Sequence, residues 1–264
     1  MIISNTIAIA QRELQSYFTS PLAYLIAAIF WFISGLFFVE LLIGEQGIIQ
    51  QIALSERAGV EIGSIDVATT FLDSFLAVLS SLTLFIVPIL SMGLYAEEKK
   101  RGTLELLATS PITNWVVALG KLLAVNILFG FLVLPVVLYE AIAFSAANPP
   151  LPPTVPLLAH LGLFLLTASL LSLGMFISSL TNNTILAAIS TFALVLLLWI
   201  LELVANSFDG WLRSSLLNIS LIESYNNMVR GILKSSDLIL FVSCIFLGIF
   251  LTAQSVHSLR LNRK

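Results

Sequence analysis

The sequence predicts an all-α integral membrane protein with six transmembrane helices, and three observations lead to that fold class. Hydrophobic residues make up 58% of the 264 residues and charged residues only 10%, whereas a soluble domain carries about 25% charged residues. Six apolar stretches are each long enough to cross a bilayer, which takes roughly 20 residues. Most basic residues gather near the ends of these stretches. We expect a single transmembrane domain over residues 1–264.

The first element is an amphipathic helix over residues 3–19. Such a helix is expected to lie in the membrane interface, with Tyr17 and Phe18 near the lipid headgroups. A water-exposed helix that packs on a partner is the alternative. No signal peptide is expected, because the first apolar stretch is too long and lacks a cleavage site. The apolar side of the helix holds Ile3, Ile7, Ala10, Leu14 and Phe18, and the polar side holds Asn5, Gln11, Arg12, Glu13 and Gln15.

Six membrane spans follow, and the basic residues predict their orientation. With both termini in the cytoplasm, eight basic residues lie inside and four outside, as the positive-inside rule requires. An even number of spans agrees with that arrangement. The spans are placed at about 22–43, 71–95, 116–144, 157–180, 184–206 and 237–257. The inner residues are Arg12, Lys99, Lys100, Arg101, Lys121, Arg260, Arg263 and Lys264, and the outer ones are Arg57, Arg213, Arg230 and Lys234.

Two outer connections are long enough to carry structure of their own. Residues 44–70 are acidic and contain glycine, and a short helix against the membrane surface is expected there. Residues 207–236 are too apolar for a free loop, yet their charged residues interrupt any span. They predict an amphipathic or re-entrant pair of short helices on the outer face.

The densest run of charge lies between the second and third spans, at residues 97–113. Gly102 is expected to end the incoming helix, and Thr103 to cap a short helix with three leucines. Ser110-Pro111 then stops that helix, and Thr113 caps the next span. Charges at a helix end could simply bind anionic headgroups. Leucines exposed to the cytoplasm, however, require a partner surface.

This run also carries a family resemblance. Residues 98–112 read Glu-Lys-Lys-Arg-Gly-Thr-Leu-Glu-Leu-Leu-Ala-Thr-Ser-Pro-Ile and are followed by Leu119-Gly120-Lys121. They resemble the first cytoplasmic loop of ABC-2 type transporter permeases, and are most similar to the branch that includes the gliding-motility and nitrous-oxide-reductase maturation permeases. Two further segments are similar to the family. They are an elbow helix before the first span, with Arg12, Glu13, Tyr17, Phe18 and Pro21, and the segment before the last span, with Glu223, Tyr225, Arg230 and Gly231. In the latter, Ile222 stands where the family usually has a histidine.

The resemblance implies a function and a set of partners. It implies a permease subunit that translocates a substrate out of the cytoplasm across the cytoplasmic membrane. Separate ATPase subunits, which bind ATP and Mg, would drive it, and a second copy or a related permease would complete the path. The loop then forms a coupling helix that docks on the ATPase. Its residues are Glu97, Glu98, Lys99, Lys100, Arg101, Gly102, Thr103, Leu104, Glu105, Leu106, Leu107, Thr109, Ser110 and Pro111.

The sequence offers no chemistry for an enzyme. The fragment Gly120-Lys121 is not a phosphate loop, because Trp115 occupies the position of the first glycine and Leu122 follows the lysine. Two histidines in separate apolar runs and one cysteine make no convincing metal or nucleophilic site. We therefore expect no catalytic, cofactor or metal site in this chain, and no nucleic-acid partner.

The lack of ionisable residues near the middle of the predicted spans favours an external energy source. The acidic residues near the spans all fall close to the outer boundary, where solvation at the interface or a polar exit vestibule explains them. An ion-coupled carrier generally needs charge deep in the membrane. Small residues of the fourth span predict close helix packing, or else a path for an amphipathic substrate. The acids are Glu40, Asp73, Glu140, Glu202 and Asp237, and the small residues are Ser169, Ser172, Gly174 and Ser178.

Two other functions fit the same chain. A membrane anchor or assembly protein could recruit a cytoplasmic partner through the loop without moving a substrate. A self-contained carrier or channel is the third possibility, and dependence on an ion gradient would support it.

Overall fold

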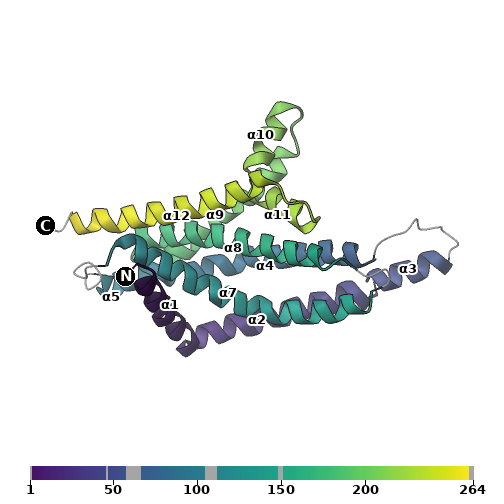
Figure 1. Ribbon diagram of the computed structural model, residues 1–264, viewed down its shortest axis with the longest axis horizontal. Coiled ribbons are helices and arrows are strands. Elements are labelled where there is room, and N and C mark those ends of the chain that lie inside the picture. The colour runs from purple at the N-terminus through teal and green to yellow at the C-terminus, as the bar shows by residue number, and fades with distance from the viewer. Residues whose placement is uncertain (1, 46, 58–66, 105–111, 148–150, 262–264) are drawn as a thin grey trace.

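The computed structural model describes residues 2–45, 47–57, 67–104, 112–147 and 151–261, and in this part of the chain all regular structure is helical (Figure 1). Six stretches have the length and apolar composition of membrane spans, which confirms the predicted fold class. In chain order the helices are α1 (Ile2–Thr19), α2 (Pro21–Ile43), α3 (Ile48–Arg57), α4 (Val67–Ser91), α5 (Gly93–Arg101), α7 (Asn114–Ser145), α8 (Thr154–Leu180), α9 (Thr184–Ala205), α10 (Trp211–Ile219), α11 (Leu221–Val229) and α12 (Ser235–Leu261).

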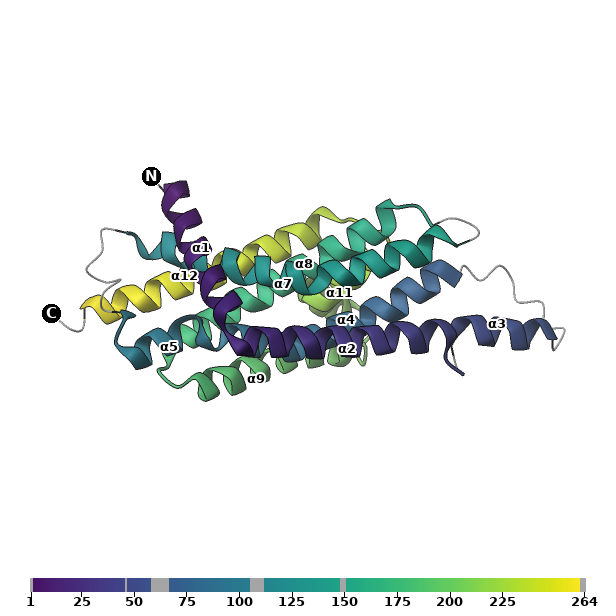
Figure 2. The same cartoon turned by 90° about the horizontal axis from the view of Figure 1, so that it is seen from below.

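The long helices run side by side as one elongated bundle. Helix α1 begins and α12 ends at the same end of this bundle, which we call the terminal end, and α5 lies there as well (Figure 1). Figure 2 shows α3 extending from the opposite end, beyond α2. The predicted spans match the observed helices to within four residues at every boundary; the largest differences include the start of α4 at Val67 instead of 71.

The bend between α1 and α2 follows from one dipeptide. Ser20 has an extended backbone, with φ −88° and ψ 124°, and Pro21 is the first residue of α2. A proline pushes the residue before it out of the helical region and suits the first turn of a helix. The chain therefore leaves α1 and enters α2 in a new direction, as Figure 2 shows.

Helix α8 is the centre of the bundle and packs against α4, α5, α7, α9, α11 and α12. Small residues permit this close packing. A Cβ atom on Gly248 of α12 would lie 2.6 Å from the carbonyl carbon of Ser172, and one on Gly174 would lie 2.4 Å from Oγ of Ser91. The Ser169 hydroxyl donates a hydrogen bond of 3.3 Å to the carbonyl of Phe241 on α12. The small residues of the fourth span therefore lie where helices approach closely.

Three short helices lie away from the terminal end: α3 extends beyond the opposite end, and α10 and α11 lie beside the bundle (Figures 1 and 2). Helix α3 falls within the predicted range 44–70, and α10 and α11 confirm the predicted pair of short helices in 207–236. Helix α11 is firmly bound, because the Tyr225 hydroxyl donates to the carbonyl of Leu76 on α4 at 2.9 Å. Helix α10 has no buried residue and projects from the bundle (Figure 1).

Two of the five acidic residues correct the prediction of interfacial solvation. Glu140 is only 2% exposed, and its Oε2 lies 3.2 Å from Nε2 of His160 on α8. Asp237 is also buried, and it accepts hydrogen bonds from Ser224 at 3.3 Å and Asn227 at 3.2 Å. Packing between helices, which local sequence does not encode, covers both carboxylates.

Candidate functional site

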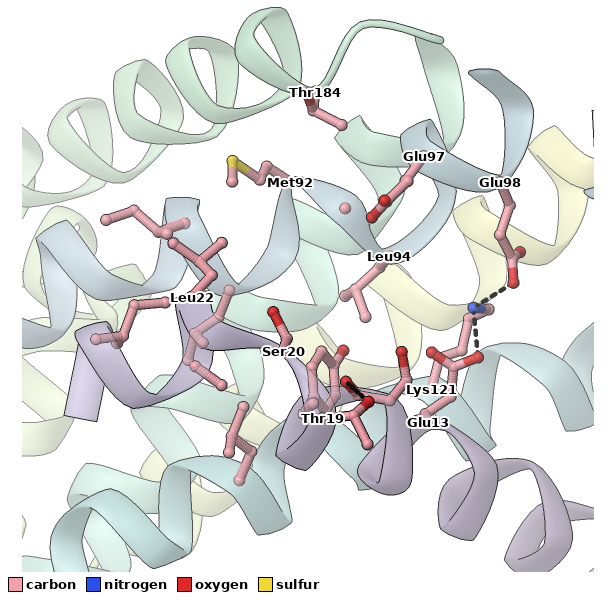
Figure 3. Close-up of a pocket in the computed structure, with 18 of the residues that line it drawn as sticks. Glu13, Thr19, Ser20, Leu22, Met92, Leu94, Glu97, Glu98, Lys121 and Thr184 are labelled. Carbon is pink, nitrogen blue, oxygen red and sulfur yellow. Dashed lines mark hydrogen bonds and ion pairs between the residues drawn. The ribbon is translucent and has the colours of Figure 1, made fainter. Parts of the chain in front are cut away.

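Three helices are joined at the terminal end by one buried lysine. Lys121 on α7 is 2% exposed, and its Nζ lies 2.9 Å from Oε1 of Glu13 and 2.9 Å from Oε1 of Glu98. Glu13 belongs to α1 and Glu98 to α5, so the lysine joins both helices to α7, as Figure 3 shows. The Nζ atom also lies 5.3 Å from the ring centre of Tyr95. We call Glu13, Glu98 and Lys121 the lysine triad.

Lys121 is the fully buried member of the triad, and the side chains of Glu13 and Glu98 are each 15% exposed. A buried ion pair gains little over an apolar core, but removal of one partner leaves an uncompensated charge and costs about 3–5 kcal/mol. The second oxygen of Glu98, Oε2, is buried and has no hydrogen-bond partner among the described residues. The two carboxylates therefore depend on a single ammonium group.

Close contact between α1 and α7 places the lysine. A Cβ atom on Gly120 would lie 2.7 Å from Cγ2 of Ile9 and 3.0 Å from the carbonyl oxygen of Thr6. A glycine is required there because α1 packs directly on the backbone of α7. This contact brings Glu13 within reach of the next residue, Lys121, and gives the Gly120-Lys121 pair a structural role.

The start of α5 is fixed to the end of α8. The Ser178 hydroxyl accepts hydrogen bonds from the backbone nitrogens of Tyr95 at 3.1 Å and Ala96 at 3.0 Å, and it donates to the carbonyl of Met92 at 2.8 Å. The first backbone N–H groups of a helix have no acceptor within the helix, so a side chain often accepts their hydrogen bonds. The Lys99 ammonium also donates to the carbonyl of Ser179. Helix α5 is thus bound to α8 and, through the triad, to α7 and α1.

The other end of α5 leads to the predicted docking loop. Gly102 has φ 70°, a left-handed conformation that favours glycine, so the prediction that Gly102 ends this helix is confirmed. Glu97, Lys100 and Arg101 are exposed, and Glu97 forms an exposed ion pair of 2.6 Å with Arg101. Thr103 is exposed and Leu104 is half-buried. The remaining predicted docking residues, Glu105, Leu106, Leu107, Thr109, Ser110 and Pro111, lie outside the described residues.

The predicted elbow residues divide between the triad and the surface. Arg12 and Phe18 are exposed, whereas Tyr17 is partly covered. The ring of Phe18 contacts that of Phe131 on α7 edge to face, with 5.3 Å between centroids. Burial and the neighbouring Glu13 carboxylate raise the pKa of Tyr17 above its usual range, so its hydroxyl remains a hydrogen-bond donor.

A cavity of about 880 Å³ lies beside the triad, between α1, α2, α4, α5 and α7 (Figure 3). Charged and hydroxyl side chains of α1 and α5 line one part of it, and apolar side chains of α2 and α4 line another. It also reaches Thr184 at the start of α9. The third segment predicted from the resemblance, Glu223, Tyr225, Arg230 and Gly231, lies around α11 at a distance from this site (Figure 1).

Comparison with known proteins identifies the family. The family model of the ABC-2 type transporter matches residues 4–233. The chain belongs to the ABC-2 type transporter family. It is accordingly a membrane-spanning permease component of an ABC transporter, a component that is generally not catalytic. A search among curated proteins found no match to this chain. In the described part of the chain, no group of three or more His, Cys, Asp or Glu residues could hold a metal ion.

Sequence reasoning named Glu13 and Glu98 as site residues but missed Lys121 as their partner. The position of Lys121 inside the apolar span predicted at 116–144 was a signal, because buried lysines are seldom left unpaired. The spacing along the chain, 108 residues to Glu13 and 23 to Glu98, gave no indication of the pairing.

Proposed function

We propose that this chain is the transmembrane subunit of an ATP-driven exporter whose separate ATPase subunits dock on residues 97–113 and on α1. The lysine triad is the observation that supports this most strongly. It ties α1 to the core helix α7, and it ties α5, which leads into the predicted docking loop, to the same helix. A force on the loop would therefore reach the spans instead of bending the loop alone.

The proposed mechanism is movement of the terminal end as a lever. Closure of the ATPases on ATP would shift α5, and the bonds from Ser178 would pass that shift to α8. The triad would pass it to α7 and α1. Packed helices respond to such shifts by changing between discrete arrangements, here facing inward and outward. ATP and Mg would stay in the partner, with no cofactor in this chain.

A second copy, or a related permease, is the proposed partner within the membrane. In the most apolar stretch of the α2 span and of α9, only 17% of residues are buried, against 61% in α8. Both helices thus present broad uncovered apolar faces, which lipid or a second subunit would cover. We further propose that the terminal end faces the cytoplasm, and that the chain belongs to the gliding-motility and nitrous-oxide-reductase maturation branch.

We expect Leu106→Arg to abolish stimulation of the partner ATPase. A charge in the centre of a docking surface removes an apolar anchor, and the affinity is expected to fall roughly thirtyfold. The measurement is copurification of the tagged chain in mild detergent, followed by the rate of ATP hydrolysis. Leu212→Arg, at an exposed position on α10, is the matched control.

A charge reversal such as Glu98→Lys would not test docking alone, because it would place two ammonium groups together in the triad. If Leu106→Arg still copurifies with the ATPase and stimulates it, the docking assignment fails. If the ATPase binds this chain but its rate of ATP hydrolysis does not change, the result would instead support the function of a membrane anchor.

A further inference from the structure

We propose that the cavity beside the triad binds one anionic phospholipid, with its head group among α1 and α5 and one acyl chain between α2, α4 and α7. The volume of about 880 Å³ lies within the range of small-molecule sites, about 300–1,000 Å³. Its lining changes from polar to apolar along its length. The apolar part consists of Leu22, Ala23, Ile26, Ile89, Leu90, Leu94 and Leu128.

The depth of the cavity suits one leaflet. Lys121 and Leu128 both line it from α7, and seven residues of helix rise about 10 Å. Half of a typical hydrocarbon core is about 15 Å thick. An acyl chain that starts at the level of the triad would therefore remain within the leaflet at the terminal end, beside side chains as apolar as itself.

The charges of the cavity favour an anionic head group. Four basic residues and three acidic ones line it. Lys121 and Arg101 are neutralised inside the chain, by the triad and by Glu97. Arg12 and Lys100 are exposed at the rim, and neither forms an ion pair with a described residue. Basic side chains at this level attract the phosphate of anionic lipids.

Hydrogen-bond donors line the same part of the cavity. The Tyr17 hydroxyl is protonated at neutral pH and can donate a hydrogen bond, and burial and Glu13 raise its pKa further. Ser16 and Ser20 add hydroxyls at the bend between α1 and α2. A free phosphate would use these groups but leave the apolar half facing water, which costs about 25 cal/mol per Å² of exposed apolar surface. A phospholipid satisfies both halves.

The test uses phosphatidylglycerol with a photoreactive diazirine on one acyl chain, added to the purified full chain in detergent. We expect mass spectrometry to find label near Ile26, Leu90 and Leu128. Ala23→Trp, on the cavity wall, should lower this labelling roughly tenfold because the indole fills the space. Ala28→Trp, on the exposed face of the same helix, should leave it unchanged and controls for folding.

A second variant tests the head group. Arg12→Ala combined with Lys100→Ala should weaken labelling roughly tenfold, and Arg213→Ala, exposed on α10, should not. Diacylglycerol with the same diazirine chain should label poorly. The proposal is overturned if diacylglycerol labels equally well, or if Ala23→Trp has no effect. It is also overturned if glycerol 3-phosphate competes as well as unlabelled phosphatidylglycerol, since that result would indicate a site for free phosphate.

Discussion

Replacement of Lys121 by methionine is expected to destabilise the protein and to uncouple α1 and α5 from α7. Methionine matches the length of the lysine stem but leaves Glu13 and Glu98 facing each other without a cation. Loss of one partner from a buried ion pair costs about 3–5 kcal/mol. For a chain of this size that corresponds to a fall of roughly 10 °C in the melting temperature, measurable by thermal unfolding in detergent.

Two further variants separate the loss of the ion pair from a general loss of stability. Lys234→Met, at an exposed position far from the triad, should leave the melting temperature unchanged. The triple variant Lys121→Met, Glu13→Gln, Glu98→Gln removes all three charges and should regain most of the lost stability. Because the link between α1 and α5 is then gone, it should still stimulate ATP hydrolysis poorly. A Lys121→Met protein as stable as the parent would show that the triad is not a buried ion pair.

The sequence predicted the elements that depend on local pattern. A run of about 20 apolar residues is sufficient to place a span, so each of the six was found to within four residues. Gly102 was recognised as a helix end because glycine readily takes the left-handed conformation that ends helices, and its φ of 70° confirms this. The pair α10 and α11 was found because its apolar residues were too many for a loop and its charges too frequent for a span.

Contacts between helices that are distant in the chain could not be predicted from the sequence. Lys121 was counted as a basic residue near a span end and as part of the motif Leu119-Gly120-Lys121, but not as an ion-pair partner. Nothing local distinguishes a solvated lysine from one that two carboxylates cover. Glu140 was placed at the interface by its depth along the helix, which is a one-dimensional measure. Its burial depends on α8 and His160 beside it. The docking residues from Glu105 to Pro111 lie outside the described residues, and their role stays a prediction.

The contact between α8 and α12 is expected to be the least tolerant of added volume. A Cβ atom on Gly248 would lie 2.5 Å from Oγ and 2.6 Å from the carbonyl carbon of Ser172. The second of these atoms is backbone and cannot rotate away. Gly248→Leu must therefore separate the two helices and weaken the hydrogen bonds from Ser169 and Ser172 to α12. Overpacking alone costs about 1–3 kcal/mol or more, so we expect a strong loss of folded protein.

Gly35 on α2 provides the matched control for Gly248. Nothing lies within 4 Å of a Cβ atom built there, so Gly35→Leu adds volume without a clash inside this chain and improves helix propensity by up to about 1 kcal/mol. Size-exclusion profiles and thermal unfolding should show that Gly35→Leu folds like the parent protein, and that Gly248→Leu is aggregated or depleted. If Gly248→Leu unfolds at the parental temperature, α8 and α12 do not pack as closely as the structure indicates. Because α8 contacts both α5 and α12, such a result would also mean that a shift of α8 need not move α12.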